Sequence, residues 1–129
     1  MKFSHRFFVK KSDIDEQGHV NNVVFVRWIQ DIAVAHWLSA TNIQQQAKFT
    51  WIVLRHEIEY KKQAFENEEI TATTWVGEPT RISWERLTEI TRGKDLLVKA
   101  RSVWCLVDRK TLKPTRITTE IKSCFETKQ

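Results

Sequence analysis

The chain has 129 residues, 41% of them hydrophobic, and a formal net charge of +5 at neutral pH. This length fits a single domain over residues 1–129, and only three glycines and two prolines argue against a low-complexity chain. No stretch approaches the roughly 20 apolar residues of a membrane span, and the first residues lack a signal peptide's apolar run. We therefore expect a soluble, cytoplasmic protein without a membrane span. Cys105 and Cys124 stand alone, which predicts reduced thiols and no metal site.

The first half of the chain predicts a strand, a polar turn and one long helix. The strand follows from alternation at Phe3, His5, Phe7 and Val9. In the turn, Gly18 can adopt a positive φ, and Asn21 or Asn22 can cap the helix that follows. Residues 23–38, VVFVRWIQDIAVAHWL, are apolar apart from a narrow polar stripe, which predicts a helix buried nearly all round. We expect this helix to end at 39–42 and a loop to cover 41–49.

The second half predicts four consecutive strands and a short helix. The first strand runs over 51–60, and its expected buried face holds alternate residues, namely Ile52, Leu54, His56, Ile58 and Tyr60. We expect a turn at 77–80, a hairpin turn at 92–95 and a C-terminal helix over 117–125 capped by Thr118 or Thr119. This order predicts an α+β fold, in which an antiparallel sheet packs against one helix. Because the helix is so apolar, we expect the sheet to curl around it and a second copy to cover the rest.

Charge is concentrated in two places that could carry function. The turn before the long helix holds Asp13, Asp15, Glu16 and His19. A carboxylate beside a helix start lies near unpaired N–H groups, which could hold an oxyanion while the carboxylate attacks or activates water. The same residue types are common in ordinary turns and caps, so a structural role remains open. Residues 81–116 carry ten Lys or Arg against four acids, which suits an anionic ligand or simply a solvated sheet face.

The turn also carries a family resemblance. The segment DEQGHVNN, Asp15 to Asn22, with Phe25 following, resembles the D-x-x-G-H-V-N-N-x-x-Y signature of the 4-hydroxybenzoyl-CoA thioesterase-like group of hotdog-fold acyl-CoA thioesterases. Segments 51–64, 80–90 and 96–114 are similar to later parts of that family in the same order. The resemblance implies a five-stranded antiparallel sheet wrapped around one long central helix, with a short C-terminal helix. It also implies a homodimer whose sheets join edge to edge, and often a homotetramer.

The resemblance further implies hydrolysis of an acyl-CoA or acyl carrier protein thioester, with no cofactor beyond the CoA of the substrate. Asp15 would be the catalytic carboxylate, as nucleophile or as general base. Gly18, His19 and Val20 would bring backbone donors to the thioester carbonyl, and Asn22 would line the site. We also expect six residues to bind substrate: Phe25, Trp28, His56, Arg81, Arg86 and Arg101. Phe25 replaces the usual Tyr, so a hydroxyl that could orient the acyl group is absent.

Three other functions remain open. The chain could be a non-catalytic acyl- or CoA-binding hotdog protein in which Asp15 is structural. It could be a hydratase or dehydratase that pairs Asp15 with His19 or His56, although no motif supports this. It could bind nucleic acid through its basic second half, which we do not expect. His56 alone, on the apolar face of a strand, is typical of a hydrogen-bonded core histidine.

Overall fold

The structure, a computed structural model, describes residues 1–126. Its five strands form one antiparallel sheet in the order β1-β3-β4-β5-β2, so β1 and β2 are the two edges. The elements are β1 (Phe3–Phe8), the 3-10 helix η1 (Lys11–Asp13), α1 (Asn22–Ala40), α2 (Ile43–Lys48), β2 (Phe49–Tyr60), β3 (Glu69–Pro79), β4 (Ser83–Arg92), β5 (Asp95–Asp108) and α3 (Thr119–Phe125). The predicted α+β hotdog fold is confirmed.

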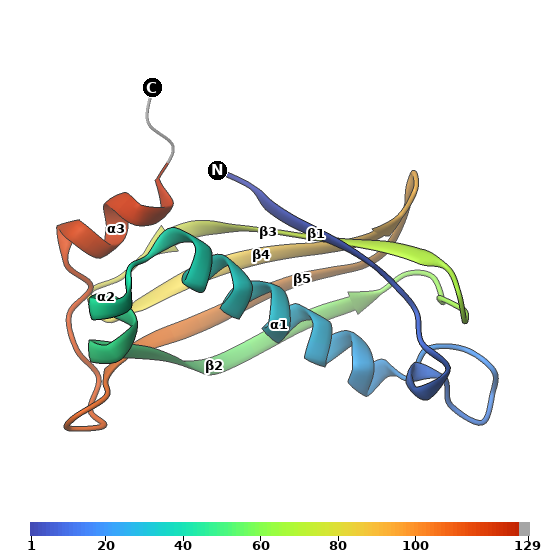
Figure 1. The fold of residues 1–129 in the computed structure, drawn as a ribbon, viewed down its shortest axis with the longest axis horizontal. Helices are drawn as coiled ribbons and strands as arrows, with labels where there is room; N and C mark the ends of the chain where they lie inside the picture. The colour runs from blue at the N-terminus through green and yellow to red at the C-terminus, as the bar shows by residue number, and fades with distance from the viewer. Residues whose placement is uncertain (127–129) are drawn as a thin grey trace.

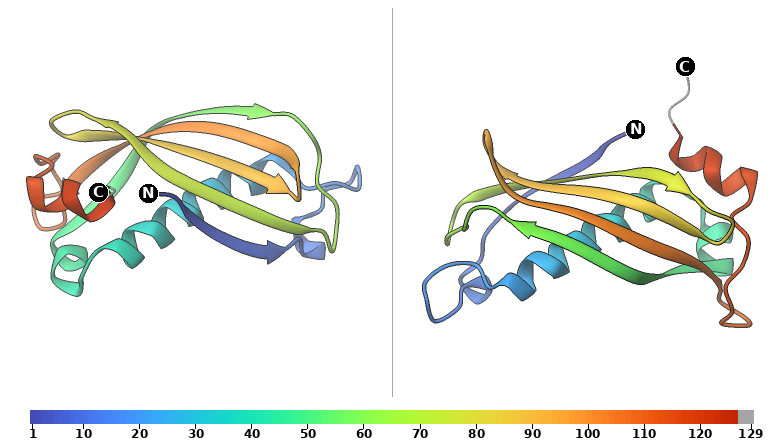
Figure 2. Two further views of the ribbon diagram at one scale, coloured as in Figure 1. Left: turned by 90° about the horizontal axis from the view of Figure 1, so that it is seen from above. Right: turned by 180° about the vertical axis from the view of Figure 1, so that it is seen from behind.

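The long helix α1 lies diagonally across one face of the curved sheet, which we call the inner face (Figure 1). The views in Figure 2 show α1 on that side only. The turn before α1 lies at one end of the sheet, whereas α2 and α3 lie at the other end, where α1 finishes. The helix therefore links two separate regions.

The start and end of α1 agree with the sequence. Of the two candidate caps, Asn21 is the N-cap, because its side chain accepts a hydrogen bond from the Val23 N–H at 3.0 Å. The helix ends at Ala40, within the predicted range. The expectation that it is buried nearly all round is wrong for the single chain, because Val23, Val34 and Leu38 are half exposed or more.

The predicted loop over 41–49 is wrong, because residues 43–48 form α2. Asn42 and Gln45 make a reciprocal capping box, in which each side-chain oxygen accepts the other residue's backbone N–H at 2.8 and 3.0 Å. The spacing Asn-x-x-Gln is the sequence signal for this box. It outweighs the polar, glutamine-rich composition that suggested a loop.

The predicted buried face of β2 is wrong at three of its five residues, because Ile52, Leu54 and Tyr60 are exposed. The register of β2 against β5 shifts between Val53 and Arg55, which leaves one extra residue in β2. Such a bulge reverses the alternation. Ile52 and Leu54 are consequently 50% and 62% exposed, while His56 and Ile58 beyond the bulge are more buried.

The remaining turns and the last helix follow the sequence closely. The hairpin turn between β4 and β5 is confirmed and contains Gly93 at φ +58°. The helix α3 is capped by Thr118, as predicted. The turn expected at 77–80 lies later, because β3 continues to Pro79 and the chain reverses between Thr80 and Ser83.

Two hydrophobic clusters pack beneath α1. The first joins the N-terminal half of α1 to β1, β3, β4 and β5, and includes Phe25, Trp28 and Ile32. The second joins the C-terminal end of α1 to α3 and the sheet, and includes Trp37 and Phe125. The turn before α1 lies beside the first cluster, and α3 completes the second.

Candidate functional site

The turn before α1 is a small closed hairpin. Asp13 C=O accepts from the Asn21 N–H at 3.1 Å, and the Asp15 N–H donates to His19 C=O at 2.9 Å. The Gly18 N–H closes the tip by donating to Asp15 C=O at 3.1 Å, with Gly18 at φ +88°. The positive φ explains glycine at this position. We call residues 13–21 the turn hairpin.

The turn hairpin orients the Asp15 carboxylate. Its Oδ1 accepts the Gln17 N–H at 2.9 Å, and its Oδ2 lies 3.7 Å from Nδ1 of His19. The side chain is 25% exposed, so it remains open to solvent or to a ligand. The His19 ring is itself held, with Nδ1 3.2 Å from Val20 C=O and Nε2 3.1 Å from Gln17 Oε1. Asp15 and His19 are therefore brought together, as their spacing suggested.

Asp13 differs from Asp15 in that its side chain is buried and both of its carboxylate oxygens accept hydrogen bonds. Its Oδ1 lies 2.9 Å from Nη2 of Arg27 on α1, and its Oδ2 accepts the Lys10 N–H at 2.9 Å. These contacts fasten the hairpin to the helix. Of the two aspartates, Asp15 is the one with a carboxylate oxygen left for chemistry.

Two of the backbone donors expected to hold the thioester carbonyl are already occupied. The Gly18 N–H is bonded within the turn, and the Val20 N–H donates to Ala64 C=O at 2.9 Å. The expectation that these two N–H groups face the carbonyl is therefore wrong. Within residues 1–126, the backbone N–H groups of His19 and Asn22 have no acceptor. These donors lie at the tip of the turn hairpin and at the start of α1.

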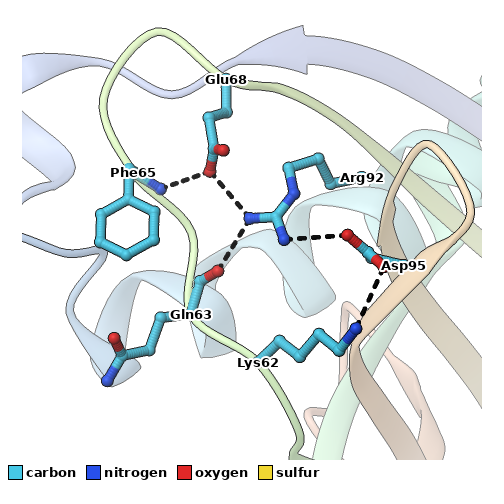
Figure 3. Close-up of polar contacts among 6 residues, drawn as sticks. All are labelled: Lys62, Gln63, Phe65, Glu68, Arg92 and Asp95. Atoms are coloured by element: carbon cyan, nitrogen blue, oxygen red, sulfur yellow. Dashed lines mark hydrogen bonds and ion pairs between the residues drawn. The ribbon is translucent and has the colours of Figure 1, made fainter.

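The bond to Ala64 ties the turn hairpin to the segment 61–68, which connects β2 to β3. Arg92 at the end of β4 holds this segment (Figure 3), since its Nη1 donates at 3.0 Å to both Gln63 C=O and Glu68 Oε1. Arg92 thus positions the carbonyl that binds Val20. Sequence reasoning missed this residue, which it assigned only to a hairpin turn.

Asp95 completes this polar network across the β4–β5 hairpin. It accepts from Nη2 of Arg92 and from Nζ of Lys62, both at 3.1 Å (Figure 3). These hydrogen bonds lower the pKa of Asp95, the bond to Lys62 contributing most. Hydrogen bonds to Asp95 and Glu68 raise the pKa of Arg92. Ion pairs and hydrogen bonds of Arg92 and Asp95 therefore hold segment 61–68 in place next to the turn hairpin.

Phe25 and Trp28 lie in the core behind the turn hairpin. Phe25 is buried and meets Trp28 edge-on at 5.2 Å and Tyr60 at 6.1 Å between ring centroids. The Tyr60 hydroxyl lies 3.5 Å from Asn22 C=O, whereas the Asn22 side chain is exposed. A tyrosine hydroxyl is therefore present at the helix start, although position 25 does not supply it. Tyr60 is the only tyrosine in the sequence, which is the one feature that could have pointed to it as the source of this hydroxyl.

His56 lies away from this turn, on the inner face of the edge strand β2. Its Nδ1 is 2.6 Å from Ser102 Oγ, and its Nε2 is 3.2 Å from Gln30 Nε2 on α1. Burial lowers its pKa. This is the hydrogen-bonded core histidine that the strand pattern indicated, and no contact joins it to Asp15 in the described part of the chain.

The three arginines expected to bind CoA do not lie together. Arg81 is exposed in the turn between β3 and β4. Arg101 lies on the opposite, outer face of the sheet and forms ion pairs with Glu57 and Glu85. Arg86 lies on the inner face and is 8% exposed. The basic excess of this region is therefore divided between both faces.

Two cavities flank α1. The larger, about 520 Å³, lies between β1 and the N-terminal half of the helix and is lined by residues that include Phe7, Lys10, Arg27 and Trp28. The smaller, about 140 Å³, lies at the C-terminal end and includes Arg86 in its wall. Asp15 lines neither cavity within the single chain.

Within residues 1–126, no three His, Cys, Asp or Glu side chains gather where they could hold a metal ion. No helix in the same range has the length and apolarity needed to cross a membrane.

Comparisons with known proteins agree with this architecture. A 1,4-dihydroxy-2-naphthoyl-CoA thioesterase from Synechocystis superposes with a TM-score of 0.82 at 14% identity, over 97% of this chain and 96% of that one. A Staphylococcus aureus protein in complex with CoA superposes with a TM-score of 0.85 at 12% identity, over 96% of this chain and 81% of that one. A mutant 4-hydroxybenzoyl-CoA thioesterase complexed with 4-hydroxybenzoyl-CoA superposes with a TM-score of 0.86 at 14% identity, over 97% of this chain and 99% of that one. These likenesses confirm the fold.

Sequence comparison identifies the family. A search of curated proteins found no match. The model of the thioesterase-like superfamily, however, matches residues 9–125, which is nearly the whole chain. The chain therefore belongs to the thioesterase-like superfamily.

Proposed function

We propose that this protein hydrolyses an acyl thioester of CoA or of acyl carrier protein, with Asp15 as the reacting carboxylate. The observation that carries the proposal is the turn hairpin itself, in a chain of the thioesterase-like superfamily. It presents a partly exposed carboxylate beside a helix start whose first N–H has no acceptor in the described chain. Together these supply a base or nucleophile and an oxyanion donor.

The proposed reaction uses the Asp15 carboxylate and the backbone N–H groups of His19 and Asn22. Because Asp15 Oδ1 accepts the Gln17 N–H, Oδ2 is the oxygen that attacks the thioester carbon or takes a proton from an attacking water. The N–H groups of His19 and Asn22 are the candidates to stabilise the oxyanion. When the tetrahedral intermediate collapses, the C–S bond breaks and the thiolate leaves and takes up a proton. If Asp15 attacked directly, water then hydrolyses the resulting anhydride.

Recognition of CoA is part of this proposal. One structural relative is in complex with CoA and another with 4-hydroxybenzoyl-CoA, which supports a CoA thioester as the substrate class. Of the three predicted arginines, Arg81 is exposed and forms no ion pair with an acid in residues 1–126. We assign phosphate binding to Arg81, because Arg86 is buried and Arg101 is neutralised by two glutamates.

We further propose that two copies pair along β2. This edge strand is twelve residues long and exposes Ile52 and Leu54, and a long apolar edge is open to pairing with another chain. Val34 and Leu38 on α1 are also exposed and would gain cover. A dimer formed in this way would explain why a helix so apolar is only partly covered by its own sheet.

The activity is tested with Asp15→Asn on a panel of aliphatic and aromatic acyl-CoAs. Asparagine keeps an oxygen for the Gln17 N–H, so the turn is preserved while the charge is lost. We expect the rate to fall by about 10²-fold or more, the usual contribution of a positioned base. Glu16→Gln removes a charge from the exposed neighbouring residue and should leave the rate unchanged. Equal rates for wild type and Asp15→Asn would refute the proposed role of Asp15.

A second function has its own supporting observation. Asp15 caps the turn through the Gln17 N–H, which is an ordinary structural use of aspartate. In that case the protein would bind acyl-CoA without hydrolysing it. Saturable binding of acyl-CoA with no release of thiol, in wild type and Asp15→Asn alike, would establish this alternative.

A further inference from the structure

The smaller cavity, at the C-terminal end of α1, is built mainly from aromatic rings. Five of them line it: Trp37, Trp51, Trp84, Trp104 and Phe125. Its volume of about 140 Å³ is close to the roughly 150 Å³ of an engineered apolar cavity that holds benzene. The space therefore fits one six-membered aromatic ring. Edge and face contacts with the surrounding rings would stabilise such a ligand.

A buried cation without an acidic partner lies in the wall of this cavity. The Arg86 side chain donates through Nη1 to His36 Nδ1 at 2.8 Å and to Thr74 Oγ1 at 3.2 Å. Its guanidinium carbon lies 5.6 Å from the centre of the Phe125 ring. All these partners are neutral or aromatic, and no carboxylate in residues 1–126 pairs with it. Burial lowers the pKa of Arg86 to about 10, which leaves it charged at neutral pH.

An unpaired buried charge is costly, so its retention calls for an anion. Glu85 also lines the cavity but does not neutralise Arg86, because its carboxylate forms an ion pair with Arg101. Arg109 also lines the cavity and donates to the backbone carbonyls of Gln46 and Phe49. The cavity wall thus has an excess of positive charge.

The neighbouring indole adds a second unused donor. Trp104 lies opposite Trp84 in the sheet, and Ser102, two residues earlier, lies opposite Arg86. Trp104 and Arg86 are therefore diagonal neighbours on the inner face, a spacing of roughly 7–8 Å that one small ligand can bridge. The buried Nε1 of Trp104 has no hydrogen-bond partner in the described chain.

We propose that this cavity binds a monocyclic aromatic carboxylate, with the ring among the tryptophans and Phe125 and the carboxylate on Arg86. The site is separate from Asp15 within one chain. Asn22 and Val34 are twelve residues apart on α1, which is roughly 18 Å along the helix axis. The proposal goes beyond thioester hydrolysis, because a free acid is the ligand and no bond is made or broken.

Binding is tested with benzoate on the full chain by titrating the intrinsic tryptophan fluorescence, with calorimetry as a second readout. Four of the six tryptophans line the cavity, so occupancy should change the emission saturably. Benzamide matches the ring without the charge, and hexanoate matches the charge without the ring. We expect each to bind at least tenfold more weakly than benzoate. Equal binding of benzoate and benzamide, or no saturable change with benzoate, would overturn the proposal.

Variants assign the anion to Arg86. Arg86→Met keeps an unbranched side chain and should weaken benzoate at least tenfold while leaving benzamide unchanged. The exposed Arg116→Met is the matched control and should bind benzoate like wild type. If Arg86→Met fails to fold, Arg86→Lys, which keeps a positive charge, should still bind benzoate more tightly than benzamide, and loss of that preference in a folded Arg86→Lys would refute the assignment. Full benzoate affinity in a folded Arg86→Met would refute the assignment. Loss of hydrolysis in Asp15→Asn has no bearing on this result.

Discussion

Arg86 on β4 and His36 on α1 share a 2.8 Å hydrogen bond in the core of the protein. Arginine can only donate, so the Nδ1 atom of His36 accepts and the imidazole is neutral. Burial, then Arg86, then the N-terminal amino group lower the pKa of His36 to about 4. The ring is further enclosed by Phe3, stacked at 4.9 Å, and by Phe125, edge-on at 5.0 Å. This pair connects α1, β4 and α3 through one neutral histidine.

The first prediction is that stability decreases between pH 6.5 and pH 4. Unfolded His36 binds a proton below its ordinary pKa of 6.5, whereas folded His36 does so only near 4. The unfolded state therefore holds more protons in this window, so acid favours unfolding, by up to about 3 kcal/mol at pH 4. Urea unfolding at pH 7 and pH 4.5 measures the effect.

The control for this prediction is His36→Gln, which keeps an acceptor for Arg86 but cannot titrate. Its unfolding free energy should fall less than that of the wild type over the same pH range. His56, whose pKa burial also lowers, remains in both proteins and cancels in the comparison. An identical pH dependence in the two proteins would contradict the assigned role of His36.

The second prediction concerns the link between Arg92 and the turn hairpin. Arg92→Met removes the donors that hold Gln63 C=O and Glu68, so the segment carrying Ala64 should loosen. We expect faster hydrogen exchange at the Val20 N–H, which donates to Ala64, and a loss of roughly 1 kcal/mol of stability, since the network is partly exposed. Exchange measured by NMR tests this directly. The neighbouring exposed Lys94→Met should leave Val20 unaffected.

Much of the fold was predictable because the sequence patterns are local. The caps at Asn21 and Thr118 and the length of α1 follow from capping and periodicity. The exposed face of β2 was not predictable, because a single extra residue at the bulge depends on pairing with β5. Alternation in one strand carries no information about its partner.

The candidate site was predictable in part for the same reason. The contact between Asp15 and His19 is local, four residues apart, and was suggested by the turn. The bonds from Val20 to Ala64 and from Arg92 to Glu68 join segments distant in sequence, and the burial of Arg86 depends on α1 and α3. These contacts are set by tertiary packing, which one sequence does not reveal.

The third prediction is that Gly18 is required for the shape of the turn. An added Cβ would meet no atom within 4 Å, so any penalty for Gly18→Ala arises from φ +88° alone. That left-handed conformation costs a non-glycine residue roughly 1–2 kcal/mol. Urea unfolding should show this loss, and Gly18→Asn should lose less, because asparagine tolerates positive φ. Equal stability of Gly18→Ala and wild type would show that the turn adapts.

The fourth prediction tests self-association through β2. Lysine on a sheet edge discourages pairing with a second chain, so Ile52→Lys with Leu54→Lys should convert a dimer to a monomer. Light scattering after size exclusion, at micromolar concentration, measures the mass. Ile43 on α2 is also exposed but lies off this edge, so Ile43→Lys is the matched control and should leave the mass unchanged. If the wild type has the mass of one chain, the proposed β2 interface is wrong. A twelve-residue edge strand with exposed apolar side chains should form a dimer at micromolar concentration.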